Sequence, residues 1–289
     1  MYVLSLIAAT GFALASVAQY RASQSLSAEL NLRISLLGRL FRNADFLRGS
    51  FFDVIGVVAQ FFALTLGPVS IVQPILSFGL VLALGIEHRL ARRKFQPLDI
   101  IASIITTLSL AYFVVLRGRN VSDNLSITLT LILALSILAW DLALLVAARI
   151  MAKRLPQLMV VGSAAISLGC GSVLEREVGL ALHHGVIHTA LYPPTWILIV
   201  LGPVSLLLVQ SAFQLGALKS VLPMLTIGEP TVAILLSAVM LGETVLPLYH
   251  LIAGSITLAV MILSLLYLAR SESNFRENVD RAVEDEDDD

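Results

Sequence analysis

The feature of this sequence that most constrains its fold is a succession of apolar runs, each close to the ~20 residues that a helix needs to cross a bilayer. Nine such runs fall near residues 2–19, 50–66, 69–87, 98–116, 125–148, 157–174, 193–215, 218–241 and 247–269. The composition agrees, because 57% of the 289 residues are hydrophobic and 13% are charged, against roughly 45–50% and about 25% in soluble domains. The sequence therefore predicts an all-α polytopic membrane protein with about nine transmembrane helices and the lipid bilayer as its first partner.

The distribution of Lys and Arg predicts the orientation, because basic residues favour cytoplasmic loops. With the N-terminus outside, 16 basic residues fall on the inner side and 3 on the outer side. We therefore expect a multi-pass protein of the cytoplasmic membrane, with its N-terminus outside and its C-terminus in the cytoplasm. Residues 20–49 carry five arginines among several leucines. This segment is expected either to lie as a helix on the inner membrane surface or to extend the first span.

Two segments of the chain match one another, which predicts an internal repeat. Residues 63–79 align without gaps on residues 212–228, and seven of the 17 positions are identical. The similarity continues beyond these segments and defines two copies, at 50–116 and 193–269. Because the copies begin on opposite sides of the membrane, they form inverted repeats, which many secondary transporters place around a midplane site. Positions expected to be structural in the repeats are Gly67, Pro74, Glu87, Gly216, Pro223, Pro230 and Glu243.

The repeats divide the chain into three parts. The N-terminal half, 1–116, holds the first span, the basic segment 20–49 and the first repeat. The C-terminal half, 117–270, holds spans five and six and the second repeat. Residues 271–289 contain nine acidic residues and two arginines. Because like charges in such a run repel one another, we expect a disordered acidic cytoplasmic tail.

One stretch resembles a known family. The sequence Gly228-Glu229-Pro230-Thr231-Val232-Ala233-Ile234-Leu235-Leu236, with Leu241-Gly242-Glu243 after it and an echo ending in Glu87, looks like the repeat signature of the drug/metabolite transporter superfamily, specifically its EamA-like domains. The nine-span plan is similar to that of the NIPA-like magnesium transporters. The resemblance implies a secondary transporter that moves a small solute or metabolite by alternating access. Two alternatives stay open, a NIPA-like divalent cation (magnesium) transporter and a non-transporting membrane assembly subunit.

Ionisable side chains inside spans are candidates for the site, because each costs about 2.5–3.5 kcal/mol at the centre of a helix in the membrane. Glu229 lies in the middle of span eight, and it could carry a proton, ligate a cation or cap backbone donors near a proline. Asp141 is expected to be either a buried hydrogen-bonded group or a lining residue. Asp53 either belongs to the pathway or reaches the interface beside Arg48. The uncharged candidates, all on repeat helices, are Gln60, Gln73, Gln210 and Gln214.

Other functional classes find little support in the residues. No catalytic motif is present, so we expect no enzyme, no cofactor and no nucleic-acid partner, with a homodimer as one option for the assembly. The lone Cys170 excludes a disulfide framework within this sequence. His184 and His188 would share a helix face in a predicted outer loop, 175–192, downstream of two glutamates. They form either a weak metal site or part of a solvated loop.

Overall fold

The computed structural model describes residues 1–66, 78–91, 127–151, 155–216 and 218–240, together with isolated residues in the segments between them and up to residue 267. Within these ranges the chain forms helices joined by short turns, and no strand occurs there. Five of these helices are long and apolar enough to cross a membrane. The prediction of an α-helical membrane protein is therefore confirmed. The nine-span count also includes the runs near 98–116 and 247–269, most of which lie outside the described residues.

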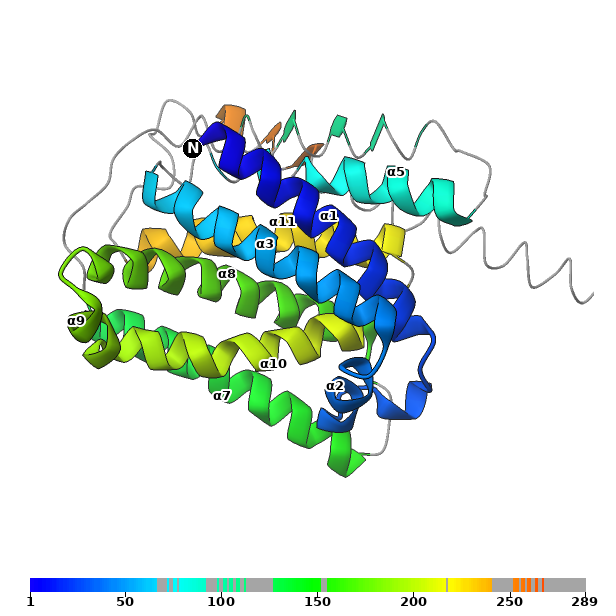
Figure 1. The fold of residues 1–289 in the computed structure, drawn as a ribbon, viewed down its shortest axis with the longest axis horizontal. Helices are drawn as coiled ribbons and strands as arrows, with labels where there is room; N and C mark the ends of the chain where they lie inside the picture. The colour runs from blue at the N-terminus through cyan, green and yellow to red at the C-terminus, as the bar shows by residue number, and fades with distance from the viewer. Residues whose placement is uncertain are drawn as a thin grey trace, which may run out of the picture.

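The first group of helices contains α1 (Tyr2–Gln24), α3 (Ala44–Leu66) and α5 (Gly79–Ala91). Figure 1 shows α1 and α3 lying side by side, with α5 next to α1. Small residues let α1 and α3 approach closely, since a Cβ added at Gly11 would lie 2.8 Å from the carbonyl oxygen of Phe52. Such close approach through glycine is a common way of packing helices in membranes.

The second group contains α7 (Ile127–Met151), α8 (Gln157–Leu182), α10 (Pro193–Leu215) and α11 (Leu218–Met240). Helix α8 is central to it, because it packs extensively against both α10 and α11. Pro203 lies inside α10, and Pro223 and Pro230 lie inside α11, yet both helices continue through these residues. The two groups meet chiefly where α1 crosses α10 and where α3 contacts α8.

The basic segment 20–49 has a structure that neither sequence-based alternative describes fully. Helix α1 continues to Gln24, a 3-10 turn follows at Ala28–Leu30, the short helix α2 covers Ile34–Leu40, and α3 begins at Ala44. The apolar side of α2 packs into the protein, because Leu36 and Leu40 are fully buried in a cluster with Phe46 and Leu207. The first span is therefore extended by a few residues only, and α2 is a packed element at the end of the α10 helix.

The predicted outer loop 175–192 is wrong in its first half. Helix α8 runs to Leu182, eight residues beyond the expected end of span six at 174, and the short helix α9 follows at Val186–Leu191. The three successive charged residues Glu175, Arg176 and Glu177 are typical of a loop in a hydropathy pattern. Inside the helix both glutamates accept hydrogen bonds, Glu175 from Gln60 of α3 and Glu177 from Tyr192 between α9 and α10.

Two aligned glycines of the similar segments occupy corresponding places. A Cβ at Gly79 of α5 would lie 2.8 Å from the carbonyl oxygen of Ala9 in α1. A Cβ at Gly228 of α11 would lie 2.6 Å from the Cβ of Ala165 in α8. Both positions therefore require glycine for the same reason, a close contact with another helix of their own group. Of the other structural repeat positions, Gly67, Pro74 and Glu243 lie outside the described residues, whereas Glu87 lies in α5.

A candidate binding cavity lined by carboxylates

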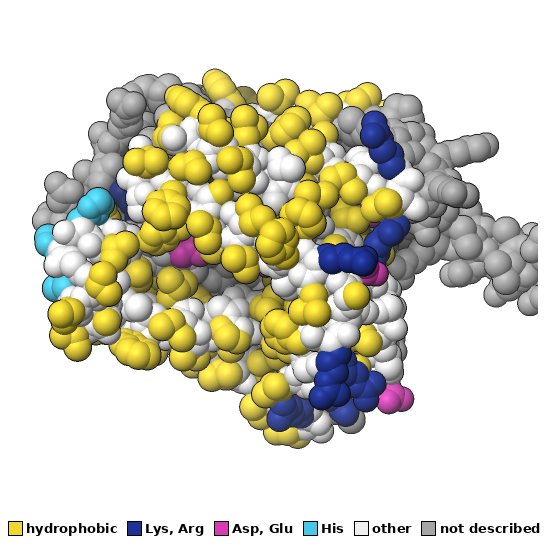
Figure 2. Space-filling model, in the orientation of Figure 1, with side chains coloured by type: hydrophobic (Ala, Val, Ile, Leu, Met, Phe, Trp, Pro, Cys, Tyr) yellow, Lys and Arg dark blue, Asp and Glu magenta, His cyan; other side chains and the backbone are white. Residues whose placement is uncertain are grey.

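A cavity of about 400 Å³ lies between the two groups of helices. Six helices line it, with α1, α3 and α5 on one side and α8, α10 and α11 on the other. This volume is in the range of small-molecule sites, which span roughly 300–1,000 Å³. In the space-filling view the surface is hollowed between α3 and α10, and an acidic side chain is visible in the hollow (Figure 2).

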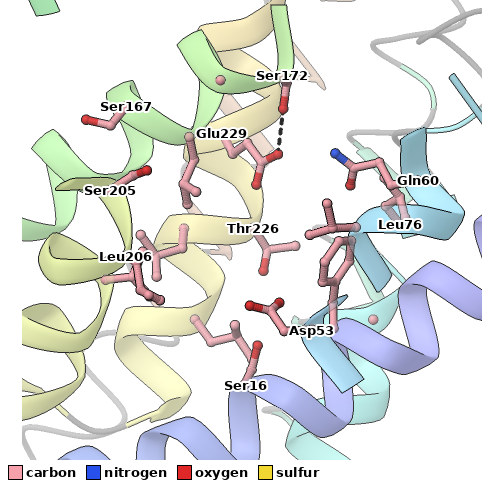
Figure 3. Close-up of a pocket in the computed structure, with 18 of the residues that line it drawn as sticks. Ser16, Asp53, Gln60, Leu76, Ser167, Ser172, Ser205, Leu206, Thr226 and Glu229 are labelled. Atoms are coloured by element: carbon pink, nitrogen blue, oxygen red, sulfur yellow. Dashed lines mark hydrogen bonds between the residues drawn. The ribbon is translucent and has the colours of Figure 1, made fainter. Parts of the chain in front are cut away.

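Three carboxylates from three helices line this cavity: Asp53 from α3, Glu175 from α8 and Glu229 from α11. Glu229 lies within electrostatic reach of both other carboxylates. In the close-up, Asp53 and Ser16 lie toward one end of the cavity, and Glu229 and Ser172 toward the other (Figure 3). The fold therefore brings together acidic groups that are 54 to 176 residues apart in the sequence.

Each carboxylate accepts a hydrogen bond from one polar neighbour. The Ser172 hydroxyl donates to Glu229 over 2.8 Å, and the Gln60 amide donates to Glu175 over 3.1 Å. The Gln19 amide donates to Asp53 over 3.2 Å. A carboxylate can accept about four hydrogen bonds, so each group keeps acceptor capacity for a ligand.

The remaining wall is mostly apolar, and no Lys, Arg or His side chain is among the described residues that line the cavity. Negative charge in an apolar site is costly unless a cation or a proton compensates it. The site is therefore suited chemically to a cationic ligand or to proton exchange.

Close packing of α8 and α11 positions Glu229. A Cβ at Gly169 would lie 2.8 Å from the carbonyl oxygen of Glu229 and 2.7 Å from the Cβ of Val232. The neighbouring Pro230 also lines the cavity. The glycine thus holds α11 against α8 at the height of the carboxylate, and Ser172, one turn further along α8, can reach it.

Several sequence-based candidates lie in the cavity. Glu229, Asp53 and Gln60 line it. Asp53 lines the cavity and accepts a hydrogen bond from the Gln19 amide, whereas Arg48 forms an ion pair with Asp45 at 3.1 Å. Glu175 is a cavity residue that the sequence analysis missed. A helical signal was present, since Glu175 follows Ser172 and Gly171 by three and four residues on one face of a helix.

Other candidates lie elsewhere. Asp141 is fully buried in α7 and bonded to the Ser167 hydroxyl, so its position agrees with the alternative of a buried hydrogen-bonded group. Gln210 is also fully buried, and Gln214 accepts from Asn31 at the end of α10. Neither glutamine is among the residues that line the cavity. Gln73 lies outside the described residues.

The predicted metal pair lies at the α9 end of the protein. The rings of His184 and His188 are 5.5 Å apart, and His188 stacks on Tyr192. Burial raises the pKa of Tyr192. Glu177 contributes to this, because it accepts a hydrogen bond from the Tyr192 hydroxyl over 2.9 Å. In the part of the chain that the structure describes, no group of three or more His, Cys, Asp or Glu side chains is placed to hold a metal ion. A site of two histidines stays a prediction.

Comparisons with known proteins add one relative. A protein of Corynebacterium glutamicum that is itself uncharacterized is 25% identical over 283 residues, which cover 94% of this chain and 95% of the relative. No family model matches the chain. No solved structure matches it.

Proposed function

We propose that the protein is a secondary transporter that carries a small cationic solute across the cytoplasmic membrane by alternating access to the cavity. The observation that carries the proposal is the cavity between two helix groups, lined by Asp53, Glu175 and Glu229 and by no basic side chain among the described residues. Intramembrane carboxylates typically mark ion pathways and proton relays. Cation binding at this site, in exchange for protons, offsets the cost of the buried negative charge.

The arrangement of the helices supports two inverted repeats. Helices α3 and α10 contain aligned residues, and so do α5 and α11. Helix α1 packs on α3 and α5, just as α8 packs on α10 and α11, and the aligned glycines make the equivalent contacts. In inverted repeats, rocking of one group against the other exposes a fixed site to each side of the membrane in turn.

The charge distribution supports the proposed orientation, with the N-terminus outside. Lys and Arg side chains gather at the α2 end of the molecule, whereas the histidines near α9 lie at the opposite end (Figure 2). The arginines of segment 20–49 that are exposed at the α2 end are Arg21, Arg33, Arg39, Arg42 and Arg48. Because basic residues favour the cytoplasm, the α2 end is the inner end.

An organic cation fits the described residues better than a magnesium ion does. Magnesium requires near-octahedral oxygen ligands around one point. The three carboxylates line a common cavity, but they are not grouped around a single ion position in the described residues. A solute that carries amino groups at separate positions can pair with more than one of them.

The test uses purified protein with four probes of graded charge: putrescine and longer diamines, n-butylamine, butanediol and Mg²⁺. A ligand that binds the folded protein raises its thermal stability, by an amount that grows with the ratio of concentration to Kd. We expect stabilisation in the order diamine, monoamine, diol, and counterflow of a labelled diamine in proteoliposomes. Stabilisation by Mg²⁺ and not by the amines would identify the divalent cation transporter instead. Binding without counterflow of any probe would contradict the transporter proposal and favour a membrane assembly subunit.

A further inference from the structure

A seam of buried and partly buried polar bonds closes the inner end of the contact between α1 and α10. The Gln24 amide donates to the carbonyl of Phe213 over 2.6 Å, and the Asn31 amide donates to the carbonyl of Ser211 over 2.9 Å. Ser23 donates to the side chain of Gln210 over 2.6 Å. We call these three bonds the polar seam. They join the two helix groups at the end of the molecule that carries α2.

One branch of the polar seam continues to the cavity. The Gln210 amide nitrogen donates to the Gln19 side-chain oxygen over 2.6 Å, and the Gln19 nitrogen donates to Asp53 over 3.2 Å. Because an ionised carboxylate can only accept hydrogen bonds, Asp53 fixes the direction of the Gln19 amide, and through it that of the Gln210 amide. The Gln19 nitrogen therefore faces Asp53. Gln19, Gln210 and Ser23 are at most 5% exposed, so water has little access to the bonds among these three side chains.

We propose that Gln19 is a positioning residue that couples the charge of Asp53 to closure of the polar seam. A hydrogen bond to an ionised carboxylate is about twice as strong as one between neutral groups. When a cation or a proton neutralises Asp53, the Gln19 bond weakens, the orientation of Gln210 is no longer fixed from the cavity side, and α1 separates from α10. Occupation of the cavity thus opens its inner end. A role of this coupling in transport rests on the proposed carrier function, whereas the link between the charge of Asp53 and the polar seam does not depend on it.

The test measures access to the cavity from the inner end. Ser16 lines the cavity one turn from Gln19, and a Ser16→Cys variant in a Cys170→Ala background places a thiol behind the polar seam. An impermeant thiol reagent is applied to inside-out and right-side-out membrane vesicles. When Gln19 and Asp53 are intact, the reagent should modify the thiol at position 16 slowly from the membrane face that carries Arg39. Asp53→Asn, which is neutral but still accepts a hydrogen bond, should raise that rate about five- to tenfold, and Gln19→Leu should raise it at least as much.

Two matched controls separate coupling from a general loss of packing. Gln60→Leu removes the equivalent amide–carboxylate bond to Glu175 in the same cavity, and it should leave the inner rate unchanged. Gln24→Leu breaks a seam bond that does not lead to Asp53, so its effect should add to that of Asp53→Asn. The double variant Gln19→Leu/Asp53→Asn should be modified from the inner face no faster than Gln19→Leu alone, because both substitutions act on the same hydrogen bond.

The outcomes are distinct. An unchanged rate in Asp53→Asn, or additive effects of Gln19→Leu and Asp53→Asn, would overturn the proposal, because the seam would then be insensitive to the carboxylate. The isosteric Asp53→Asn variant decides the matter if Gln19→Leu does not fold. The assay needs no solute, so its result does not depend on transport. If the wild-type protein fails to transport diamines, the proposed function is wrong, and the modification rates still test the coupling.

Discussion

Replacing Glu229 with glutamine is the sharpest test of the cavity as a cation site. The change removes one of three charges and keeps the shape of the side chain, and the amide oxygen can still accept the bond that Ser172 donates over 2.8 Å. A carboxylate and an ammonium group ~4 Å apart attract by about 4 kcal/mol at an effective dielectric constant of ~20. The effect of the substitution on the binding free energy should be roughly half of this attraction. The other two carboxylates still bind the ligand, and the ligand must shed water to enter the site.

We therefore expect Glu229→Gln to weaken diamine binding by about 2 kcal/mol, a factor of about 30 in Kd. Isothermal titration of putrescine into purified protein measures this, with butanediol as the uncharged ligand. The matched control is Glu177→Gln. Glu177 lies on α8 near Glu175 and is buried, but it accepts from Tyr192 and does not line the cavity, so putrescine binding should not change.

Transport separates the roles of Glu229 further. If the carboxylate carries the coupling proton, Glu229→Gln should abolish transport driven by a pH gradient and leave diamine exchange largely intact. If it is a cation ligand only, both modes should weaken together. Wild-type binding and wild-type rates in both modes, from a folded Glu229→Gln protein, would refute the assignment of this residue to the site.

Three further predictions follow from the fold and the packing. In a Cys170→Ala background, His183→Cys should react with an impermeant thiol reagent from outside the cell and Gly38→Cys should not, and the reverse result would overturn the orientation. Gly169→Ala should lower the unfolding free energy by about 1–3 kcal/mol, because its Cβ would meet α11 at 2.7 Å, whereas Gly162→Ala, with open space around it, should not; thermal unfolding in detergent measures both. Asp141→Asn should keep the bond to Ser167 and change stability little, whereas Asp141→Ala should cost about 1–3 kcal/mol. Because Asp141 does not line the cavity, a loss of diamine binding in a stable Asp141→Asn protein would contradict the geometry of the site.

The helices could be predicted from the sequence because hydrophobicity is a local property of each run. The predicted runs 193–215 and 218–241 differ from α10 and α11 by at most one residue at each end. The predicted helix ends are wrong where a helix continues through residues with charged side chains. Residues 44–49 of α3 and 175–182 of α8 carry charged side chains that hydropathy assigns to loops, yet hydrogen bonding continues through them.

By itself the sequence determined that the chain is an α-helical membrane protein and that Glu229 is an ionisable group within a helix. Only the tertiary structure decided which polar groups meet. Glu175 joins Glu229 because α8 extends past its apolar run and packs on α11, and Asp53 faces Gln19 while Arg48 turns to Asp45. Gln210 and Asp141 have the same character in the sequence as Gln60 and Asp53, but they are buried outside the cavity lining. The reason is physical: composition sets whether a helix is stable in lipid, whereas its rotation and its neighbours set which side chains face the cavity.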